Sequence, residues 1–463
     1  MAGNIYLISS IVAISIASFF IAPRTNSTDG FFKGVTEDGR SPTLITLILS
    51  QVTTWIFARS LLNAAILGYY FGIAGAIAYA TYYLSFLTGG MIVDKLRFQH
   101  GVENVQAYLH QSYGTFGHSS YNVVIGVRLL SEVFANLLVV GIIFGVAGSF
   151  SYIIAIIAIA VLTLGYSMMG GLSASLRTDV LQTLVLYAGL VVLITITVWQ
   201  PDFNYSAIIV SSPDLSSPGW VLLAVAALQI WSYPLHDPVM MDRGFITDRR
   251  TTRASFLHAC WISIIGIMIF GIIGTYAGLN KLEGEAMVST LPRLLGEPTM
   301  LLFNFALIVS AVSTLDSTLS SASKLIVSDM GIVKRSVQNG RIAMALFLLG
   351  GLIFLFIGSK DLFAAVAVSG TASMFLTPVI LFNIIGNRQT AQWAYAFTFF
   401  LAMGGAVLYM LESGGHISLI EPIFGYGHKY SKLLLICACI LIGGLFSFSV
   451  SLKSSNPATS TTQ

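Results

Sequence analysis

Long apolar runs separated by short polar connections make up almost the whole chain. A helix needs roughly 20 apolar residues to cross the hydrocarbon core of a bilayer. Runs of about that length predict roughly thirteen transmembrane helices, near residues 5–22, 43–69, 72–93, 119–147, 150–169, 177–199, 219–241, 254–278, 299–323, 341–358, 361–385, 392–411 and 431–452. Membrane barrels are built from short strands of alternating polarity, and the sequence contains no series of them. The pattern predicts an all-α polytopic membrane protein.

The composition agrees with that pattern and excludes other classes. Of the 463 residues, 56% are hydrophobic and 9% are charged, whereas soluble domains carry about 25% charged residues. The net charge of +3 is too small to indicate a nucleic-acid partner. The three cysteines lie in apolar runs, without the spacing of a disulfide framework or a metal site. The sequence also lacks a nucleophile–base pair, a metal-ligand set and a phosphate-binding glycine loop, so we do not expect an enzyme.

Lysine and arginine are unequally distributed between the two sets of connections. With the N-terminus outside, the inner connections hold most of the basic residues, including Arg243, Arg249 and Arg250. Because positive charge concentrates on the cytoplasmic side, we expect a multi-pass plasma-membrane (cell inner membrane) protein with a cytoplasmic C-terminus. The run 5–22 lacks a basic leader and is expected to be retained as a helix. The Ser/Thr-rich tail 453–463 is expected to be disordered.

The segment Ser310–Asp329 concentrates hydroxyl groups within an apolar run. On a helix, one face would collect the residues spaced by three and four, which are Ser310, Ser313, Asp316, Ser317 and Ser320. Small hydroxyl residues serve helix packing, but hydroxyl and carboxylate oxygens are also the ligands of hard cations. Both interpretations stay open. Asp316 beside the Ser313–Thr314 pair favours the cation site, because buried ionisable groups in membranes are usually functional.

Two other runs carry features that a regular lipid-facing helix would not have. The run 43–69 is loaded in its middle with the polar residues Gln51, Thr53, Thr54, Arg59, Ser60 and Asn63. The run 219–241 contains Pro234 and Pro238, which cannot continue a regular helix. Helices broken in this way line binding sites in transporters. Arg59 either faces such a cavity or pairs with a buried carboxylate.

Charged residues in two further segments have structural interpretations. Arg128 and Glu132 are four apart and can pair on one helix face, either as a structural pair or as a substrate contact. After Gly170–Gly171 ends one helix, the next is expected from residue 177, with Asp179 in its first turn. A carboxylate there interacts favourably with the helix dipole. Its position alone therefore predicts a capping role for Asp179.

Four segments together resemble the sodium:solute symporter family, which includes transporters of proline, pantothenate, sialic acid and glucose. They are QVTTWIFARSLL, YSMMGGLSASLRTDVLQ, HDPVMMDRGF and STLDSTLSSASKLIVSD, and the resemblance extends from about Ile5 to Leu452. It implies a five-plus-five inverted-repeat (LeuT-like) transporter fold with broken first and sixth core helices. The implied parts are an extra N-terminal helix with its inner loop (1–41), the first repeat (42–199), an outer loop (200–218), the second repeat (219–385), two additional helices (386–452) and the tail (453–463).

The resemblance also implies site residues. The main sodium site would use the backbone carbonyls of Thr53, Ile56 and Ser310 and the hydroxyls of Ser313 and Thr314. A second sodium site, present in some members, would use Asp179, Ser313, Asp316 and Ser317, which replaces the capping role of Asp179. The substrate pocket would be lined by Trp55, Arg59, Ser60, Trp231, Tyr233, Ser369 and Thr371. Phe57 and Arg59 depart from the family pattern, so the solute pose of known members need not transfer.

Together, the pattern and the resemblance predict a sodium-coupled secondary active symporter that imports a small polar organic solute by alternating access. Its ligands would be that solute and sodium as the coupling ion; no other cofactor, nucleic acid or required protein partner is expected. If Arg59 faces the pocket, it favours a carboxylate-bearing solute. Three alternatives stay open: the same fold driven by protons through Asp179 or Asp316, a transporter-like sensor, and a channel. A sensor would need an output domain and a channel a pore loop, and neither pattern is present.

Overall fold

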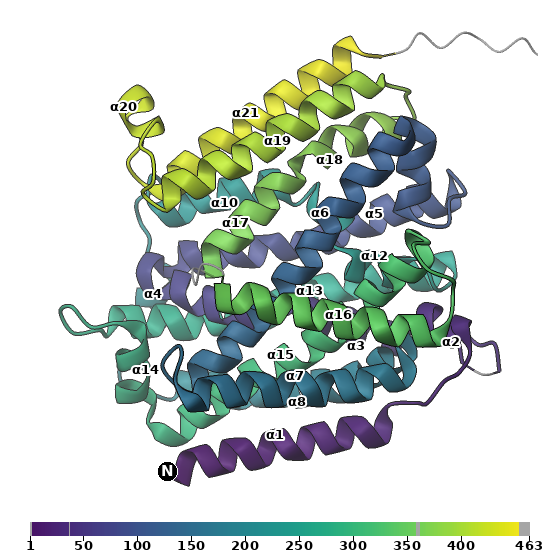
Figure 1. The fold of residues 1–463 in the computed structure, drawn as a ribbon. Coiled ribbons are helices and arrows are strands. Elements are labelled where there is room, and N and C mark those ends of the chain that lie inside the picture. The colour runs from purple at the N-terminus through teal and green to yellow at the C-terminus, as the bar shows by residue number, and fades with distance from the viewer. Residues whose placement is uncertain (1, 37, 358–361, 453–463) are drawn as a thin grey trace, which may run out of the picture.

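The computed structural model describes residues 2–36, 38–357 and 362–452, and the regular structure within them is helical (Figure 1). The α-helices are α1 (Ala2–Ile21), α2 (Thr28–Lys33), α3 (Leu44–Trp55), α4 (Ala58–Thr81), α5 (Ser85–Phe98), α6 (Val105–Phe144), α7 (Phe150–Gly170), α8 (Leu172–Val198), α9 (Tyr205–Ile209), α10 (Pro218–Gln229), α11 (Tyr233–His236), α12 (Pro238–Gly244), α13 (Arg249–Leu279), α14 (Met287–Leu295), α15 (Glu297–Lys324), α16 (Val337–Ile357), α17 (Leu362–Ala372), α18 (Leu376–Pro378), α19 (Gln392–Ser413), α20 (Ile420–Phe424) and α21 (Lys429–Val450). Short 3₁₀ segments, η1 (Tyr82–Leu84) and η3 (Ser373–Phe375), and π-helical segments, η2 (Leu325–Asp329) and η4 (Val379–Ile385), continue some of them.

Within the described residues, ten helical stretches are long and apolar enough to cross a membrane. Three shorter apolar helices accompany them: Ile5–Ile21, Leu44–Trp55 and Pro218–Gln229. The last two belong to the runs in which the sequence predicts a break. The polytopic class is therefore as predicted, while the predicted number of about thirteen membrane helices is not fully confirmed.

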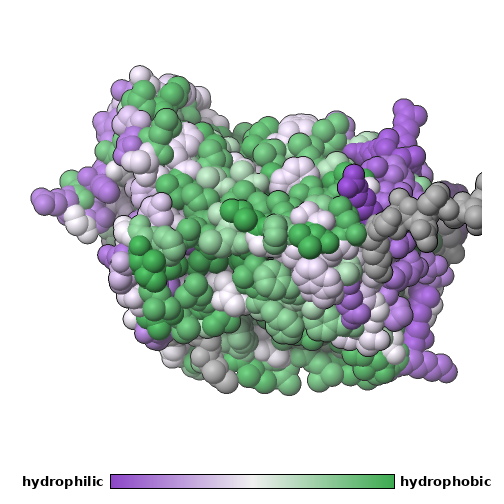
Figure 2. Space-filling model, turned by 90° about the horizontal axis from the view of Figure 1, so that it is seen from above, coloured by the Kyte–Doolittle hydropathy of each residue, from purple (hydrophilic) through white to green (hydrophobic). Residues whose placement is uncertain are grey.

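The face of the molecule seen in Figure 2 has an apolar middle between two polar ends. In Figure 2 the hydrophobic side chains fill the centre of the view and the hydrophilic ones gather at both ends. Helix α2 lies at one of these ends, and α14 and α20 lie at the other (Figure 1). The start of α1 and the end of α21 also lie at opposite ends. This distribution suits a chain that crosses a membrane several times, because the apolar middle can face lipid while the polar ends face water.

Helix α15 forms the centre of the bundle and carries the hydroxyl-rich segment. It packs against α8, α6, α16, α3 and α4, and every residue from Ala306 to Ser323 is buried. Its hydroxyl groups therefore face other helices instead of lipid. In a membrane interior without water, such groups must find their hydrogen-bond partners within the protein.

Helices α4 and α13 pack so closely that glycine is required between them. A methyl group added at Gly274 of α13 would lie 2.0 Å from the carbonyl oxygen of Ala65 in α4. One added at Gly278, a turn later, would lie 2.2 Å from the carbonyl oxygen of Tyr69. Small residues that allow backbones to touch are a recurrent way of associating helices in membranes, because lipid gives no hydrophobic driving force between them.

Some boundaries differ from the predicted ones. Helix α8 begins at Leu172, directly after Gly171, whose positive φ of 55° separates it from α7. Asp179 consequently lies inside α8 and not in its first turn, so the capping interpretation is wrong. Helix α6 begins at Val105, well before the predicted start at 119, and turns at Gly114 with a φ of 64°. The predicted outer loop 200–218 contains the short helix α9.

Candidate functional site

The candidate site is built around the break between α3 and α4. Helix α3 ends at Trp55, Ile56 and Phe57 have non-helical backbone angles, and α4 starts at Ala58. A helix that stops inside a membrane leaves backbone N–H and C=O groups without helical partners. Neighbouring helices supply them: the N–H of Ala58 donates to Asn136 Oδ1 at 3.2 Å, and Tyr83 donates its hydroxyl to the carbonyl of Trp55 at 2.9 Å.

Hydroxyl groups of α15 meet this break. Ser310 donates its hydroxyl to the carbonyl oxygen of Ile56, and Thr314 donates to the carbonyl oxygen of Ser310 at 2.7 Å. Thr53, one turn before Ile56, has a buried hydroxyl with no hydrogen-bond partner. Four of the five residues predicted for the main sodium site thus lie at or beside one junction of α3 and α15. The fifth residue, Ser313, donates its hydroxyl to Asp179 instead.

Two buried carboxylates lie beside that junction. Asp179 of α8 accepts hydrogen bonds from Ser313 at 2.8 Å and from Ser50 at 2.6 Å. Asp316 of α15 accepts from Ser167 at 2.7 Å and from Thr178 at 2.8 Å. Both carboxylates have no exposed surface. The residues predicted for the second sodium site therefore cluster, but Asp316 bonds to hydroxyls of α7 and α8 instead of sharing partners with Ser313.

Arg243 stands in the middle of the predicted second sodium site. The sequence places it among basic residues of an inner connection; the structure places it on α12 with its side chain fully buried. Its Nη2 donates to Asp179 Oδ2 at 3.1 Å and to the hydroxyl of Ser317 at 2.9 Å. Counting basic residues by connection missed this position, because such counting assumes that an arginine beside a helix end faces water. The nearby Pro238 is a signal that the chain here returns into the bundle.

A small cavity opens on the other side of the α3–α4 break. It is lined by Trp55, Phe57, Arg59, Ser60, Tyr79, Tyr82, Tyr83 and Tyr233. The rings of Trp55 and Tyr233 meet edge to face with centroids 6.0 Å apart, and those of Tyr82 and Tyr233 at 5.5 Å. Its volume of about 20 Å³ is enough for one water molecule but not for an organic solute.

The cavity contains only part of the predicted substrate pocket. Trp55, Arg59, Ser60 and Tyr233 line it, whereas Trp231, Ser369 and Thr371 do not. Thr371 is linked to it indirectly, because Gln229 receives a hydrogen bond from Tyr82 at 2.9 Å and approaches Thr371 at 3.5 Å. Tyr79, Tyr82 and Tyr83 were missed by the sequence analysis. An aromatic ring in an apolar helix gives no sign of whether it faces a cavity, a neighbouring helix or lipid.

Arg59 belongs to a chain of buried ion pairs. It pairs with Glu132, Glu132 also pairs with Arg128, and Arg128 Nη2 lies 3.3 Å from Asp237 Oδ2. The side chains are at most 2% exposed, and two positive and two negative groups balance each other. The guanidinium carbon of Arg59 also lies 4.8 Å from the centre of the Phe57 ring. Arg59 therefore meets Glu132, and its positive charge is compensated in this conformation.

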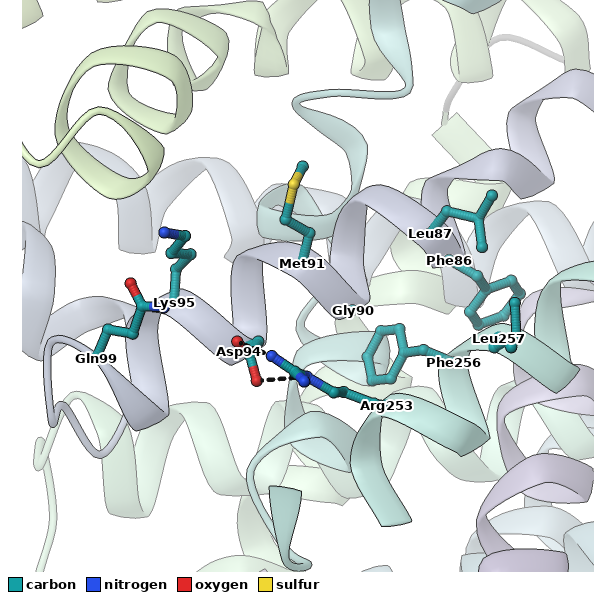
Figure 3. A pocket seen from close by; sticks show the side chains of 10 residues that line it. All are labelled: Phe86, Leu87, Gly90, Met91, Asp94, Lys95, Gln99, Arg253, Phe256 and Leu257. Carbon is teal, nitrogen blue, oxygen red and sulfur yellow. Dashed lines mark hydrogen bonds and ion pairs between the residues drawn. The ribbon is translucent and has the colours of Figure 1, made fainter. Parts of the chain in front are cut away.

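A larger groove of about 390 Å³ lies apart from this site, between α5 and α13 (Figure 3). Its walls are mostly apolar, with Phe86, Leu87 and Phe256 among them, and it shares no residue with the candidate site. Asp94 accepts two hydrogen bonds from Arg253, at 2.8 and 2.7 Å, and two more from Arg249. The carboxylate thus joins the end of α5 to the start of α13.

Comparison with known proteins gives an independent view of the fold and family. The model of the sodium:solute symporter family matches residues 37–208. No curated protein sequence matches the chain significantly. A substrate-bound, outward-open Na⁺-coupled sialic acid symporter superposes with a TM-score of 0.70 at 14% identity, covering 98% of this chain and 99% of that one. A nucleobase-cation-symport-1 family transporter, closed with bromovinylhydantoin bound, superposes with a TM-score of 0.56 at 14% identity, covering 92% and 96%.

These structural similarities agree with the arrangement of broken helices described above. The TM-scores of 0.70 and 0.56 show a shared fold, and that fold is the LeuT-like transporter fold with broken helices at α3–α4 and α10–α12. The family match covers the segments that contain the QVTTWIFARSLL and YSMMGGLSASLRTDVLQ motifs. The chain is a multi-pass membrane protein of this fold, and the model of the sodium:solute symporter family, which its motifs resemble, matches it over residues 37–208.

Proposed function

We propose that the chain is a sodium-coupled symporter that moves a small polar organic solute by alternating access. The observation that carries the proposal is the contact between Ser310 and the carbonyl of Ile56. It brings α15, in the proposed second repeat (219–385), onto the break of the first repeat (42–199). In this fold, ion binding at the junction of two repeats controls how one part of the bundle moves against the other.

The proposed sodium site would use carbonyls of Thr53, Ile56 and Ser310 and hydroxyls of Ser313 and Thr314. All five residues are buried in the bundle, and oxygen atoms are the ligands that a hard cation requires. Hydroxyls of Ser310 and Thr314 donate to the carbonyls of Ile56 and Ser310. Sodium at the junction would attract the same oxygens and tie α3 to α15. With the N-terminus outside, as proposed, entry of one positive charge contributes about 2.3 kcal/mol per 100 mV.

The solute would bind in the aromatic cavity at the same break. Its present volume requires the surrounding helices to separate before a solute can enter, as alternating access demands. Ser60 and the hydroxyls of Tyr79, Tyr82 and Tyr233 offer polar contacts on ring-lined walls. The ion pair between Arg59 and Glu132 gives no support to a preference for carboxylates, so we propose a polar solute without requiring that group.

Proton coupling remains the alternative candidate, and one observation favours it. Within the part of the chain that the structure describes, Asp316 is buried and bonds only to hydroxyl donors, without an ion pair. A buried carboxylate without a cation is costly when ionised. Such a group could take up a proton during the cycle. Solute uptake that follows a pH gradient in sodium-free buffer would favour this alternative.

The test begins with the purified protein and a library of small solutes. Thermal unfolding measured in sodium chloride and in choline chloride should show one solute class that stabilises the protein only when sodium is present. That class is then assayed for uptake into proteoliposomes. Ser313→Ala and Thr314→Ala should raise the sodium concentration needed, while the exposed Ser289→Ala should not. Accumulation that is unchanged when choline replaces sodium would overturn the proposal.

A further inference from the structure

We infer that the guanidinium of Arg243 is a built-in cation that takes the place of a second sodium ion, so that this transporter binds one sodium per chain. The inference rests on the proposed function and specifies its ion stoichiometry. It concerns the cluster of Asp179, Ser317, Ser175 and Ser50, which we call the Arg243 cluster. This cluster contains two of the four residues that the family resemblance assigns to a second sodium site.

The first step is the number of oxygens that Arg243 binds. Its Nε donates to Ser50 at 2.7 Å, its Nη1 to the carbonyl of Val239 at 3.1 Å, and its Nη2 to Ser175 at 3.0 Å, besides the contacts with Asp179 and Ser317. These oxygens come from α3, α8, α12 and α15. A planar guanidinium with five donor hydrogens suits such a cage. Two of the oxygens that the second sodium site would use, Asp179 Oδ2 and the hydroxyl of Ser317, are therefore already occupied by N–H groups.

The second step is charge. Arg243 and Asp179 form a buried ion pair whose side chains have no exposed surface. A sodium ion at the same place would sit beside a guanidinium in a medium of low dielectric, where like charges repel strongly. Asp316 does not provide an alternative carboxylate ligand for a second sodium ion, because its two oxygens already accept hydrogen bonds from Ser167 and Thr178. The carboxylate that would attract a second sodium is thus neutralised by the chain itself.

The third step separates this cluster from the proposed main site. Ile56, Ser310 and Thr314 form hydrogen bonds with one another and none with Arg243 among the described contacts. Ser313 joins the two places by donating to Asp179. The main site can therefore take an ion while the guanidinium stays in place. Because the guanidinium is tethered to α12, it supplies a positive charge that never leaves with the solute.

The experiment counts radioactive sodium ions bound per chain at saturation, using the purified full chain in nanodiscs. The wild type should bind one. Arg243→Gln frees the Asp179 carboxylate and should bind two, whereas Arg243→Gln combined with Asp179→Asn removes both charges and should return to one. Arg249→Gln is the matched control, because this arginine is partly exposed and Asp94 keeps Arg253 as a partner; it should bind one.

The outcomes distinguish the inference from the proposed function. Two sodium ions bound to the wild type would overturn the inference and leave sodium coupling intact. No sodium bound to the wild type would overturn the proposed function and the inference with it. If Arg243→Gln does not fold, Arg243→Lys retains a buried positive charge and should still bind one; a second ion in that variant would contradict the inference.

Discussion

Ser310 and Ile56 are 254 positions apart in the chain, yet the hydroxyl of one donates to the backbone carbonyl of the other. The carbonyl is free for this contact because α3 ends just before Ile56. The hydroxyl is free for it because α15 is buried along its whole middle and cannot bond to water. The break after α3 and the hydroxyl groups of α15 thus together form one junction between the proposed repeats.

Thr314→Ala should weaken sodium binding at that junction. The substitution removes one proposed ligand and leaves the carbonyls of Ile56 and Ser310 in place. We expect the sodium concentration for half-maximal thermal stabilisation to rise about tenfold, which corresponds to about 1.4 kcal/mol. Thr318→Ala is the control, since its hydroxyl bonds to the carbonyl of Thr314 one turn further along α15. An equal effect of both substitutions would show that Thr314 is not a ligand.

Gly274→Ala should destabilise the packing of α4 on α13. The added methyl would meet the carbonyl oxygen, the carbonyl carbon and the Cα of Ala65 at 2.0, 2.6 and 2.7 Å, and backbone atoms cannot rotate away. We expect a loss of about 1–3 kcal/mol or more in the free energy of unfolding, measured by denaturant titration in micelles. At Gly404 of α19 an added methyl meets nothing within 4 Å, so Gly404→Ala should be neutral or slightly stabilising.

The connection between α13 and α14 should give a pH-dependent contribution to stability. Hydrogen bonding to Arg293 lowers the pKa of Glu285 from 4.5 to about 2. Because the folded pKa is depressed, this contribution is present above about pH 4.5 and is lost as the pH falls toward about 2. Thermal unfolding followed over this range should show a smaller acid loss in Arg293→Gln than in the wild type. Parallel curves for the two proteins would contradict this assignment.

The parts of the fold that could be predicted are those with a local cause. Proline cannot continue the interior of a helix but suits its first turn, and the structure ends α10 before Pro234 and places Pro234 and Pro238 in the first turns of α11 and α12. The polar load of 43–69 likewise marks the break after Trp55. The spacing of hydroxyl residues predicts a polar face on α15, and the structure buries the helix on every side from Ala306 to Ser323. These signals are readable because each needs only neighbouring residues.

The parts that could not be predicted depend on contacts between distant segments. Arg243 and Asp179 are 64 positions apart, and neither residue shows from its neighbours that the other will neutralise it. Arg59 had two open interpretations, and only the position of Glu132 on α6 decides between them. Tyr82 and Tyr83 lie in an apolar run whose orientation is set by packing. Which residues form a site in a helix bundle thus depends on tertiary contacts, even where neighbouring residues are enough to predict the helix breaks.

Glu132→Gln tests whether the chain of ion pairs around Arg59 is held together by its central carboxylate. The substitution leaves Arg59 and Arg128 buried with Asp237 as the one remaining acid of the chain. Because breaking a buried pair leaves an uncompensated charge, we expect the free energy of unfolding to fall by about 3–5 kcal/mol. The exposed Glu283→Gln, in the connection between α13 and α14, should have no such effect. Adding Arg59→Gln to Glu132→Gln restores the balance of charge and should recover part of the loss, measured by denaturant unfolding in micelles. If Glu132→Gln is as stable as Glu283→Gln, then Arg59 and Arg128 are compensated by other groups, and Arg59 becomes available to a solute after all.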